Sequence, residues 1–213
     1  MIKAVIFDMD GVLIDAKEWH YEALNRALAL FGFEISRYDH LTAYDGLPTK
    51  TKLEMLSLEK KLPRELHPFI NKMKQSYTME IVHGKCKPRF AQEYALSTLK
   101  SKGYRLAVAS NSIRDSVEVM MGKARLDIYL DAMFSTADIS HPKPNPEIYL
   151  KAIAKLDLAA SECLVVEDND NGIRAAVDSG AYVLVVKRVD DVNLDNIAAR
   201  IRDIEMNSNR KCA

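Results

Sequence analysis

The sequence has no excess of charge of either sign. Thirty lysine and arginine residues balance thirty aspartate and glutamate residues, so the formal net charge is zero. Proteins that bind nucleic acid or an anionic membrane surface usually show a basic excess. We therefore expect no nucleic acid and no membrane among the partners of this protein.

Long apolar runs and cysteines are also scarce. No run of roughly 18 apolar residues occurs, and the N-terminal run is too short for a signal-peptide core and is interrupted by Asp8. The cysteines Cys86, Cys163 and Cys212 show no Cys-x-x-Cys spacing, which predicts free thiols in a reducing compartment. We expect a cytoplasmic protein and, because no long apolar heptad predicts a coiled coil, a monomer.

Apolar residues are nevertheless abundant, at 48% of 213 residues, which is enough for a sizeable core. Strand-like runs occur at 105–109, 133–135, 163–166 and 182–186. Helical patterns lie before, between and after them, at 90–102, 113–122, 146–156, 171–179 and 194–204. This alternation predicts an α/β fold, with a parallel sheet covered by helices on both faces.

Residues 16–83 differ because they show helical spacing and no strand-like run. Apolar side chains recur at helical intervals over 17–31, and Pro48 suits the first turn of another helix. A further helical pattern covers 66–81. We therefore predict an α/β core of residues 1–15 and 84–213, with a small all-helical domain, residues 16–83, inserted after the first strand.

That first strand is followed by two carboxylates one residue apart, Asp8 and Asp10. Residues 2–7 are apolar and rich in β-branched side chains, which predicts a buried parallel strand. Ligands of open α/β sheets bind at the carboxyl ends of strands, and Gly11 permits a sharp turn there. Alternate residues of an extended chain point the same way, so both carboxylates can face one reacting centre. Taken alone, the pair also fits a solvated turn.

Three later polar stretches are expected near the same edge. Ser110 and Asn111 follow the second predicted strand, and Glu167 and Asp168 follow the fourth. Lys143 lies between them in a loop with three prolines, whose fixed φ lowers the entropy lost when the loop is ordered. A helix cap, a solvated charge or a turn would explain each stretch singly. Their coincidence favours a functional site.

These stretches resemble the four ordered motifs of the haloacid dehalogenase superfamily. They read Asp8-Met9-Asp10-Gly11-Val12, Ser110-Asn111, Lys143-Pro144-x-Pro and Glu167-Asp168 followed by Gly172-Ile173-x-Ala175-Ala176. The helical insertion resembles the cap domain of the branch that includes β-phosphoglucomutase and phosphoglycolate phosphatase. The likeness covers nearly the whole chain and implies a Rossmann-like core with a helical cap.

The resemblance implies a catalytic role for several of these residues. Asp8 would be the nucleophile that accepts a phosphoryl group as an aspartyl phosphate, and Asp10 would be the general acid and base. Ser110 and Lys143 would bind the transferring phosphoryl oxygens. Asn111 and Gly11 would also contact the substrate.

The resemblance further implies Mg²⁺, held by Asp8, Glu167, Asp168 and the backbone carbonyl of Asp10. Elementary chemistry asks for the same residue types. A carboxylate can form a covalent intermediate, and phosphoryl transfer needs positive charge near the equatorial oxygens. Mg²⁺ prefers hard oxygen ligands, and clustered carboxylates repel one another without a cation. We therefore expect Mg²⁺ as cofactor.

Three functions are compatible with this site. The first is a phosphatase that hydrolyses a small phosphate monoester, namely a sugar, polyol or small-acid phosphate. The second is an intramolecular sugar phosphomutase, and the third is a non-catalytic binding protein on the same scaffold. Asp10 supplies a proton-transfer group that dehalogenases generally lack, which disfavours that activity. We expect a small phosphorylated metabolite as the substrate.

The residues of the insertion bear on the choice between phosphatase and mutase. His20 matches the mutase-like pattern but also suits a hinge or packing role, and Gly46 to Lys50 resemble the substrate-specificity loop of the cap. Thr49 stands where the sugar-phosphate mutase has arginine, which favours a phosphatase. Lys50 or Lys74 could contact an anionic substrate, or lie on a solvated helix face.

Overall fold

The computed structural model describes residues 1–211, and its contacts divide the chain into two units. An α/β unit comprises Met1–Asp15 and the chain from Lys87 onward, and a helical unit comprises Ala16–Cys86. The division falls after residue 86, whereas we expected it after 83. The reason is that helix α4, His67–Lys85, continues through Gly84.

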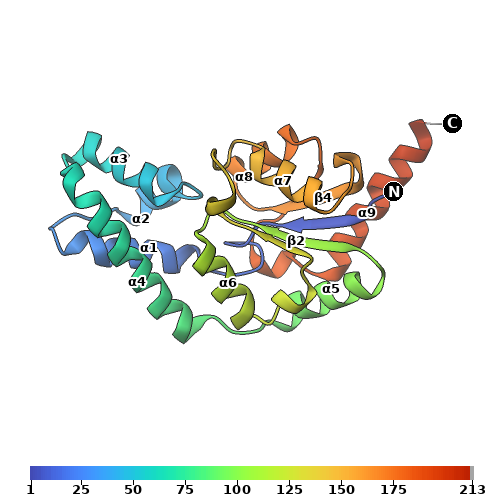
Figure 1. Cartoon of the computed structure of the whole chain (residues 1–213), viewed down its shortest axis with the longest axis horizontal. Helices are drawn as coiled ribbons and strands as arrows, with labels where there is room; N and C mark the ends of the chain where they lie inside the picture. Colours follow the sequence, from blue (N-terminus) through green and yellow to red (C-terminus); the bar gives the residue numbers. More distant parts are fainter. Residues whose placement is uncertain (212–213) are drawn as a thin grey trace. The chain divides into compact units, whose positions relative to one another are not determined.

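The α/β unit is built on a five-stranded parallel sheet, part of which is visible in Figure 1. Its strands are β1 (Ala4–Phe7), β2 (Arg105–Ala109), β3 (Ala132–Phe134), β4 (Cys163–Glu167) and β5 (Tyr182–Val185). The order across the sheet is β3-β2-β1-β4-β5. β1 therefore pairs with both β2 and β4, and the residues that follow these three strands meet at one edge.

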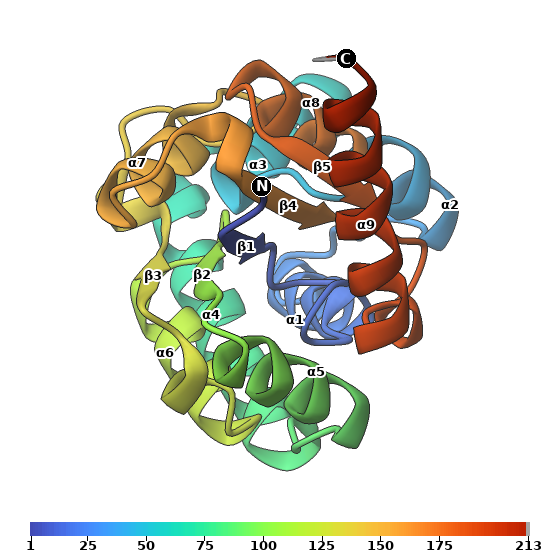
Figure 2. The ribbon, with the colours of Figure 1, turned by 90° about the vertical axis from the view of Figure 1, so that its right-hand side faces the viewer.

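Helices cover both faces of this sheet, as Figure 2 shows. α7 (Glu147–Lys155) and α8 (Asp170–Asp178) lie on one face, and α5 (Phe90–Ser101) and α9 (Leu194–Lys211) lie on the other. The core beneath α7 and α8 contains many small side chains, including Ala4, Ala107, Ala109, Ala152, Ala175 and Ala176. Small side chains allow helices and sheet to approach closely. The predicted Rossmann-like α/β class is confirmed.

The remaining helix of this unit, α6 (Arg114–Lys123), follows β2. The last helix is longer than expected, because α9 continues to Lys211 and not only to residue 204. None of the helices within residues 1–211 is long and apolar enough to cross a membrane. Cys86 and Cys163 are buried, and Cys212 lies outside the described residues.

Within the helical unit, every residue of which is described, no strand occurs. Its elements are α1 (Lys17–Ala29), α2 (Arg37–Asp39), η1 (His40–Tyr44), α3 (Thr49–Lys60), η2 (Arg64–Leu66) and α4. α1 and α4 lie side by side in Figure 1. The unit has its own core, formed by Leu24, Ala27, Leu28, Ile35, Tyr44, Leu53, Leu56, Leu62 and Ile70. The short elements α2 and η1 were not predicted, because three to five residues are too few to show a period.

Candidate active site at the edge of the sheet

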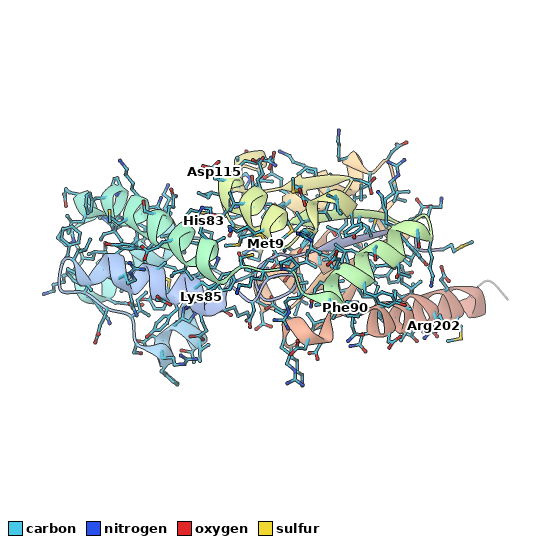
Figure 3. All side chains as sticks on the ribbon, turned by 90° about the horizontal axis from the view of Figure 1, so that it is seen from below. Met9, His83, Lys85, Phe90, Asp115 and Arg202 are labelled. Carbon is cyan, nitrogen blue, oxygen red and sulfur yellow. The ribbon has the colours of Figure 1, made fainter. Side chains whose placement is uncertain are left out.

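The turn after β1 places two aspartates at the carboxyl edge of the sheet. Met9, labelled in Figure 3, is fully buried between them and anchors the turn. Its carbonyl accepts a hydrogen bond from the N–H of Ile14 at 2.9 Å, and the N–H of Gly11 donates to the Ile14 carbonyl at 2.7 Å. Gly11 has a φ of +92°, which a residue with a Cβ rarely adopts. The sharp turn thus depends on glycine at this position.

The centre of the site is an ammonium group held between two carboxylates. Lys143 Nζ donates to Asp8 Oδ1 at 2.6 Å and to Glu167 Oε1 at 2.6 Å. Its third hydrogen bond goes to the carbonyl of Ala109, at the end of β2, at 2.9 Å. Lys143 is only 3% exposed, so these interactions are shielded from water. The ends of β1, β2 and β4 are thereby joined through one lysine.

The electrostatic environment keeps this lysine charged. Burial by itself lowers the pKa of Lys143, but Asp8 and Glu167 together raise that pKa above its usual value. Burial raises the pKa of Asp8 well above its usual range, as do the nearby carboxylates of Glu167, Asp168 and Asp10, and Lys143 works against them. An additional cation among these carboxylates would favour the ionised form of Asp8.

The loop that carries Lys143 is fixed by two side chains. The Asn111 amide donates to the Lys143 carbonyl at 3.3 Å, and its oxygen accepts from the Lys143 N–H at 3.0 Å. The Glu147 carboxylate accepts hydrogen bonds from the N–H groups of Ser140 and His141. Together with a hydrogen bond from Lys151, they lower the pKa of Glu147 to about 2. The Asn111 side chain, which we expected to contact substrate, is thus engaged in holding the lysine loop.

One of the two serines after β2 binds the second aspartate. Ser112 Oγ donates to Asp10 Oδ2 at 2.8 Å, and the Ser112 N–H donates to Ser110 Oγ at 3.0 Å. Ser110 is buried, as its place at the end of β2 predicts. Ser112 was not identified from the sequence, although a hydroxyl two residues beyond Ser110 was the available signal. The Ser112 hydroxyl thus fixes one carboxylate oxygen of Asp10 at the carboxyl edge of the sheet.

The acidic residues are close enough together to hold a metal ion. One carboxylate oxygen from each of Asp8, Glu167 and Asp168 lies within 4.8 Å of the others. Such an all-oxygen set has the chemistry that Mg²⁺ prefers. Glu167 Oε2 also accepts from the N–H of Asp168 at 3.1 Å and from Asn169 Nδ2 at 3.4 Å. The donor set therefore fits Mg²⁺, with Glu167 already bonded through both oxygens.

Two further residues confine Glu167, namely Tyr149, which was not singled out from the sequence, and Gly172, which belongs to the fourth motif. The Tyr149 hydroxyl, on α7, donates to Glu167 Oε1, and both side chains are fully buried. On α8, a Cβ added to Gly172 would lie 1.9 Å from the same oxygen. Glycine at 172 is therefore required by the carboxylate itself.

The sequence model of haloacid dehalogenase-like hydrolases matches residues 5–186. The chain belongs to this family. A phosphorylated carbohydrates phosphatase from Thermotoga maritima is 29% identical over 182 residues, which cover 84% of this chain and 82% of that protein. A phosphoglycolate phosphatase from Aquifex aeolicus is 29% identical over 180 residues, again 84% of this chain and 82% of that protein.

Among solved structures, β-phosphoglucomutase from Clostridium difficile superposes with a TM-score of 0.83 at 20% identity, covering 97% of this chain and 100% of that chain. This likeness confirms the fold, a parallel sheet with a helical insertion. The family itself rests on the sequence model, and the two relatives described above carry the names of phosphatases.

The residues expected to reach substrate from the insertion lie in the helical unit of this haloacid dehalogenase-like enzyme. Lys74 Nζ on α4 donates to His20 Nδ1 on α1 at 3.1 Å. Gly46 follows η1 with a φ of +69°, as a tight loop requires. Lys50 is exposed on α3, whereas Lys52, two residues later, is buried. The lysine that α3 buries is therefore not the one singled out from the sequence.

We expect Gly172→Ala to displace the Glu167 carboxylate in the site of this haloacid dehalogenase-like enzyme, and to reduce turnover on the order of 10²-fold. The added Cβ forces the buried Glu167 carboxylate to move, and a misplacement of about 1 Å can cost that factor. Overpacking typically costs about 1–3 kcal/mol of unfolding free energy, to be measured by urea denaturation.

The matched control for this substitution is Gly122→Ala in α6. A Cβ there meets only Asp127 Oδ2, at 4.0 Å. The change should stabilise the protein by up to about 1 kcal/mol through helix propensity, with turnover unchanged. Equal stability and turnover for the two variants would contradict the tight contact at Gly172.

Proposed function

We propose that this protein is a Mg²⁺-dependent phosphatase that hydrolyses a small phosphate monoester through a phosphoryl group carried by Asp8. The substrate class is a sugar, polyol or small-acid phosphate. The observation that carries the proposal is the buried ammonium of Lys143, 2.6 Å from both Asp8 Oδ1 and Glu167 Oε1. The phosphatase names of relatives that match more than four fifths of the chain also support it.

Asp8 is suited to nucleophilic attack because its carboxylate is already oriented. Lys143 fixes Oδ1, so rotation of the carboxylate is restricted and Oδ2 keeps a defined direction. Attack on phosphorus divides the hydrolysis into formation and breakdown of an acyl phosphate. For Lys143 to contact a phosphoryl oxygen, one of its three present hydrogen bonds must be exchanged.

Asp10 is assigned to proton transfer. Its Oδ2 accepts a hydrogen bond from the Ser112 hydroxyl at 2.8 Å, which holds the carboxylate at the same edge of the sheet as Asp8. In the first step Asp10 would protonate the leaving oxygen, and in the second it would take a proton from the attacking water. General acid–base catalysis of this kind contributes about 10²–10⁴-fold.

Asp8 and Asp168 would be the carboxylate ligands of Mg²⁺, with the Asp10 carbonyl as the resemblance implies. Bound there, the ion would supply positive charge to phosphoryl oxygens and reduce repulsion among the carboxylates. Glu167 belongs to the same oxygen cluster. Because both of its oxygens accept hydrogen bonds from protein groups, we assign it to holding Lys143 and no longer to direct coordination.

A turnover screen tests the proposal. Phosphorylated sugars, polyols and small acids would be incubated with the enzyme and Mg²⁺, and both inorganic phosphate and the organic products would be measured. Release of phosphate with the dephosphorylated alcohol supports the phosphatase. An isomeric phosphate ester without free phosphate would identify a mutase, and no conversion of any compound would point to the binding protein.

Removal of the metal should abolish turnover, and added Mg²⁺ should restore it. Mg²⁺ should also raise the unfolding free energy, by about 2.7 kcal/mol at 100 times its Kd, because it binds the folded site. The measurement is thermal unfolding with and without chelator at matched ionic strength. In Asp168→Asn the Mg²⁺-dependent shift should be lost. Full activity in excess chelator would contradict the metal assignment.

A further inference from the structure

Tyr149 contacts both charged partners at the centre of the site. Its hydroxyl donates to Glu167 Oε1, and Lys143 Nζ lies 4.7 Å from the centroid of its ring. The side chain is completely buried in the core between the sheet and α7. A tyrosine that only filled this core would leave its hydroxyl without such a charged acceptor.

We propose that Tyr149 is a positioning residue for phosphoryl transfer, which acts by fixing Glu167 and, through Glu167, the ammonium of Lys143. The inference rests on the proposed function for its kinetic consequence. It assigns Tyr149 no contact with the substrate. The structure supports it through three independent constraints on the same carboxylate.

The first constraint is the shared acceptor. Glu167 Oε1 accepts from both Tyr149 and Lys143, so the hydroxyl and the ammonium are oriented on a single atom. The second is Gly172, which lies so close to the carboxylate that there is no space for a Cβ between them. The third is the Asp168 N–H, which binds Oε2 at 3.1 Å. Of these contacts, the hydrogen bond from Tyr149 is the one that a conservative substitution, Tyr149→Phe, removes without adding an atom.

The chain connects Tyr149 to the lysine loop over a short distance in sequence. Tyr149 lies in the first turn of α7, and its N–H donates to the Pro146 carbonyl at 3.0 Å. Glu147, in the same turn, accepts hydrogen bonds from the N–H groups of Ser140 and His141, which precede Lys143 in the loop. The start of α7 therefore fixes both the backbone of the loop and, through Tyr149, the tip of its lysine.

Loss of the hydroxyl should remove one of the hydrogen bonds that orient Glu167 Oε1, so that this oxygen, and Lys143 Nζ with it, can shift. The ring remains in Tyr149→Phe, so the cation–π contact and the packing are kept. A hydrogen bond to a charged group contributes enough that its loss should change binding or rate about tenfold. Tyr149→Leu, which also removes the ring beside Lys143, should have the larger effect.

The experiment measures Tyr149→Phe in two backgrounds, the native chain and Lys143→Met. The probes are p-nitrophenyl phosphate turnover with Mg²⁺ and the affinity for inorganic phosphate by calorimetry. Binding stoichiometry gives the folded fraction, so loss of folded protein cannot imitate a change in affinity. In the native background, phosphate affinity and kcat/KM should each fall about tenfold at unchanged stoichiometry. In the Lys143→Met background the same substitution should change phosphate affinity less than about twofold, because coupled residues are not additive.

Gln92→Leu is the matched control. It removes two buried side-chain hydrogen bonds, to the Val189 carbonyl at 2.7 Å and to the Val192 carbonyl at 3.4 Å, and neither involves a residue of the site. It should lower the unfolding temperature and leave phosphate affinity unchanged. Tyr149→Phe with native phosphate affinity, or with an equal loss in both backgrounds, would overturn the inference. Failure of the native enzyme to turn over any phosphate ester would instead refute the proposed function, while the calorimetric comparison would still test Tyr149.

Discussion

Asp8→Asn will leave no measurable turnover and a folded protein. The amide is nearly the same size as the carboxylate, but it is uncharged and its oxygen is too weak a nucleophile to attack phosphorus. The fold should persist because Lys143 keeps Glu167 as its anionic partner, at 2.6 Å. Removal of one carboxylate from a cluster that includes Glu167 and Asp168 also relieves repulsion. We expect the unfolding temperature to change little.

The decisive measurement is capture of the phosphorylated enzyme. After acid quenching during turnover, peptide mass spectrometry should find phosphate on Asp8 of the native chain and none in Asp8→Asn. Asp178→Asn, an exposed carboxylate-to-amide change on α8, is the control and should turn over normally. Appreciable turnover by Asp8→Asn, or phosphate on another residue, would remove the covalent mechanism from this site.

Asp10→Asn should slow turnover by about 10²–10⁴-fold, the usual contribution of a general acid–base group. The amide can still accept the Ser112 hydroxyl, so the side chain should keep its place. It cannot deliver a proton to the leaving oxygen or take one from water. The loss should therefore depend on the leaving group, and be larger for an alkyl phosphate than for p-nitrophenyl phosphate in the first step.

Rapid-quench kinetics separate the two steps. With p-nitrophenyl phosphate, Asp10→Asn should show a burst of nitrophenol and then slow breakdown of the phosphorylated enzyme, because the second step still needs the base. Ser112→Ala leaves the carboxylate in place without its hydroxyl partner, and should give a smaller loss of the same kind. A single-turnover rate equal to that of the native chain for an alkyl phosphate would mean that Asp10 does not transfer protons.

The sequence by itself determined the elements and most of the residues at the edge. β1 and the alternating helices and strands were predictable because hydrophobic period and turn residues act over a few positions. Asp8, Asp10, Lys143 and Asp168 could be identified because each follows a strand or lies in a proline-stiffened loop. The all-helical insertion followed from the lack of a strand-like run over 16–83.

Only the tertiary structure decided which side chains meet. The order β3-β2-β1-β4-β5 sets β2 and β4 on either side of β1, and local periodicity does not encode that order. The bond from Lys143 to Asp8 joins residues 135 positions apart, and the bond from Asn111 to the Lys143 backbone spans 32 positions. Tyr149 was not singled out from the sequence, and Gly172 was identified only as part of a motif, without its contact with Glu167. They became part of the site because folding buries a charged carboxylate against them, and a buried charge must be hydrogen-bonded and closely enclosed.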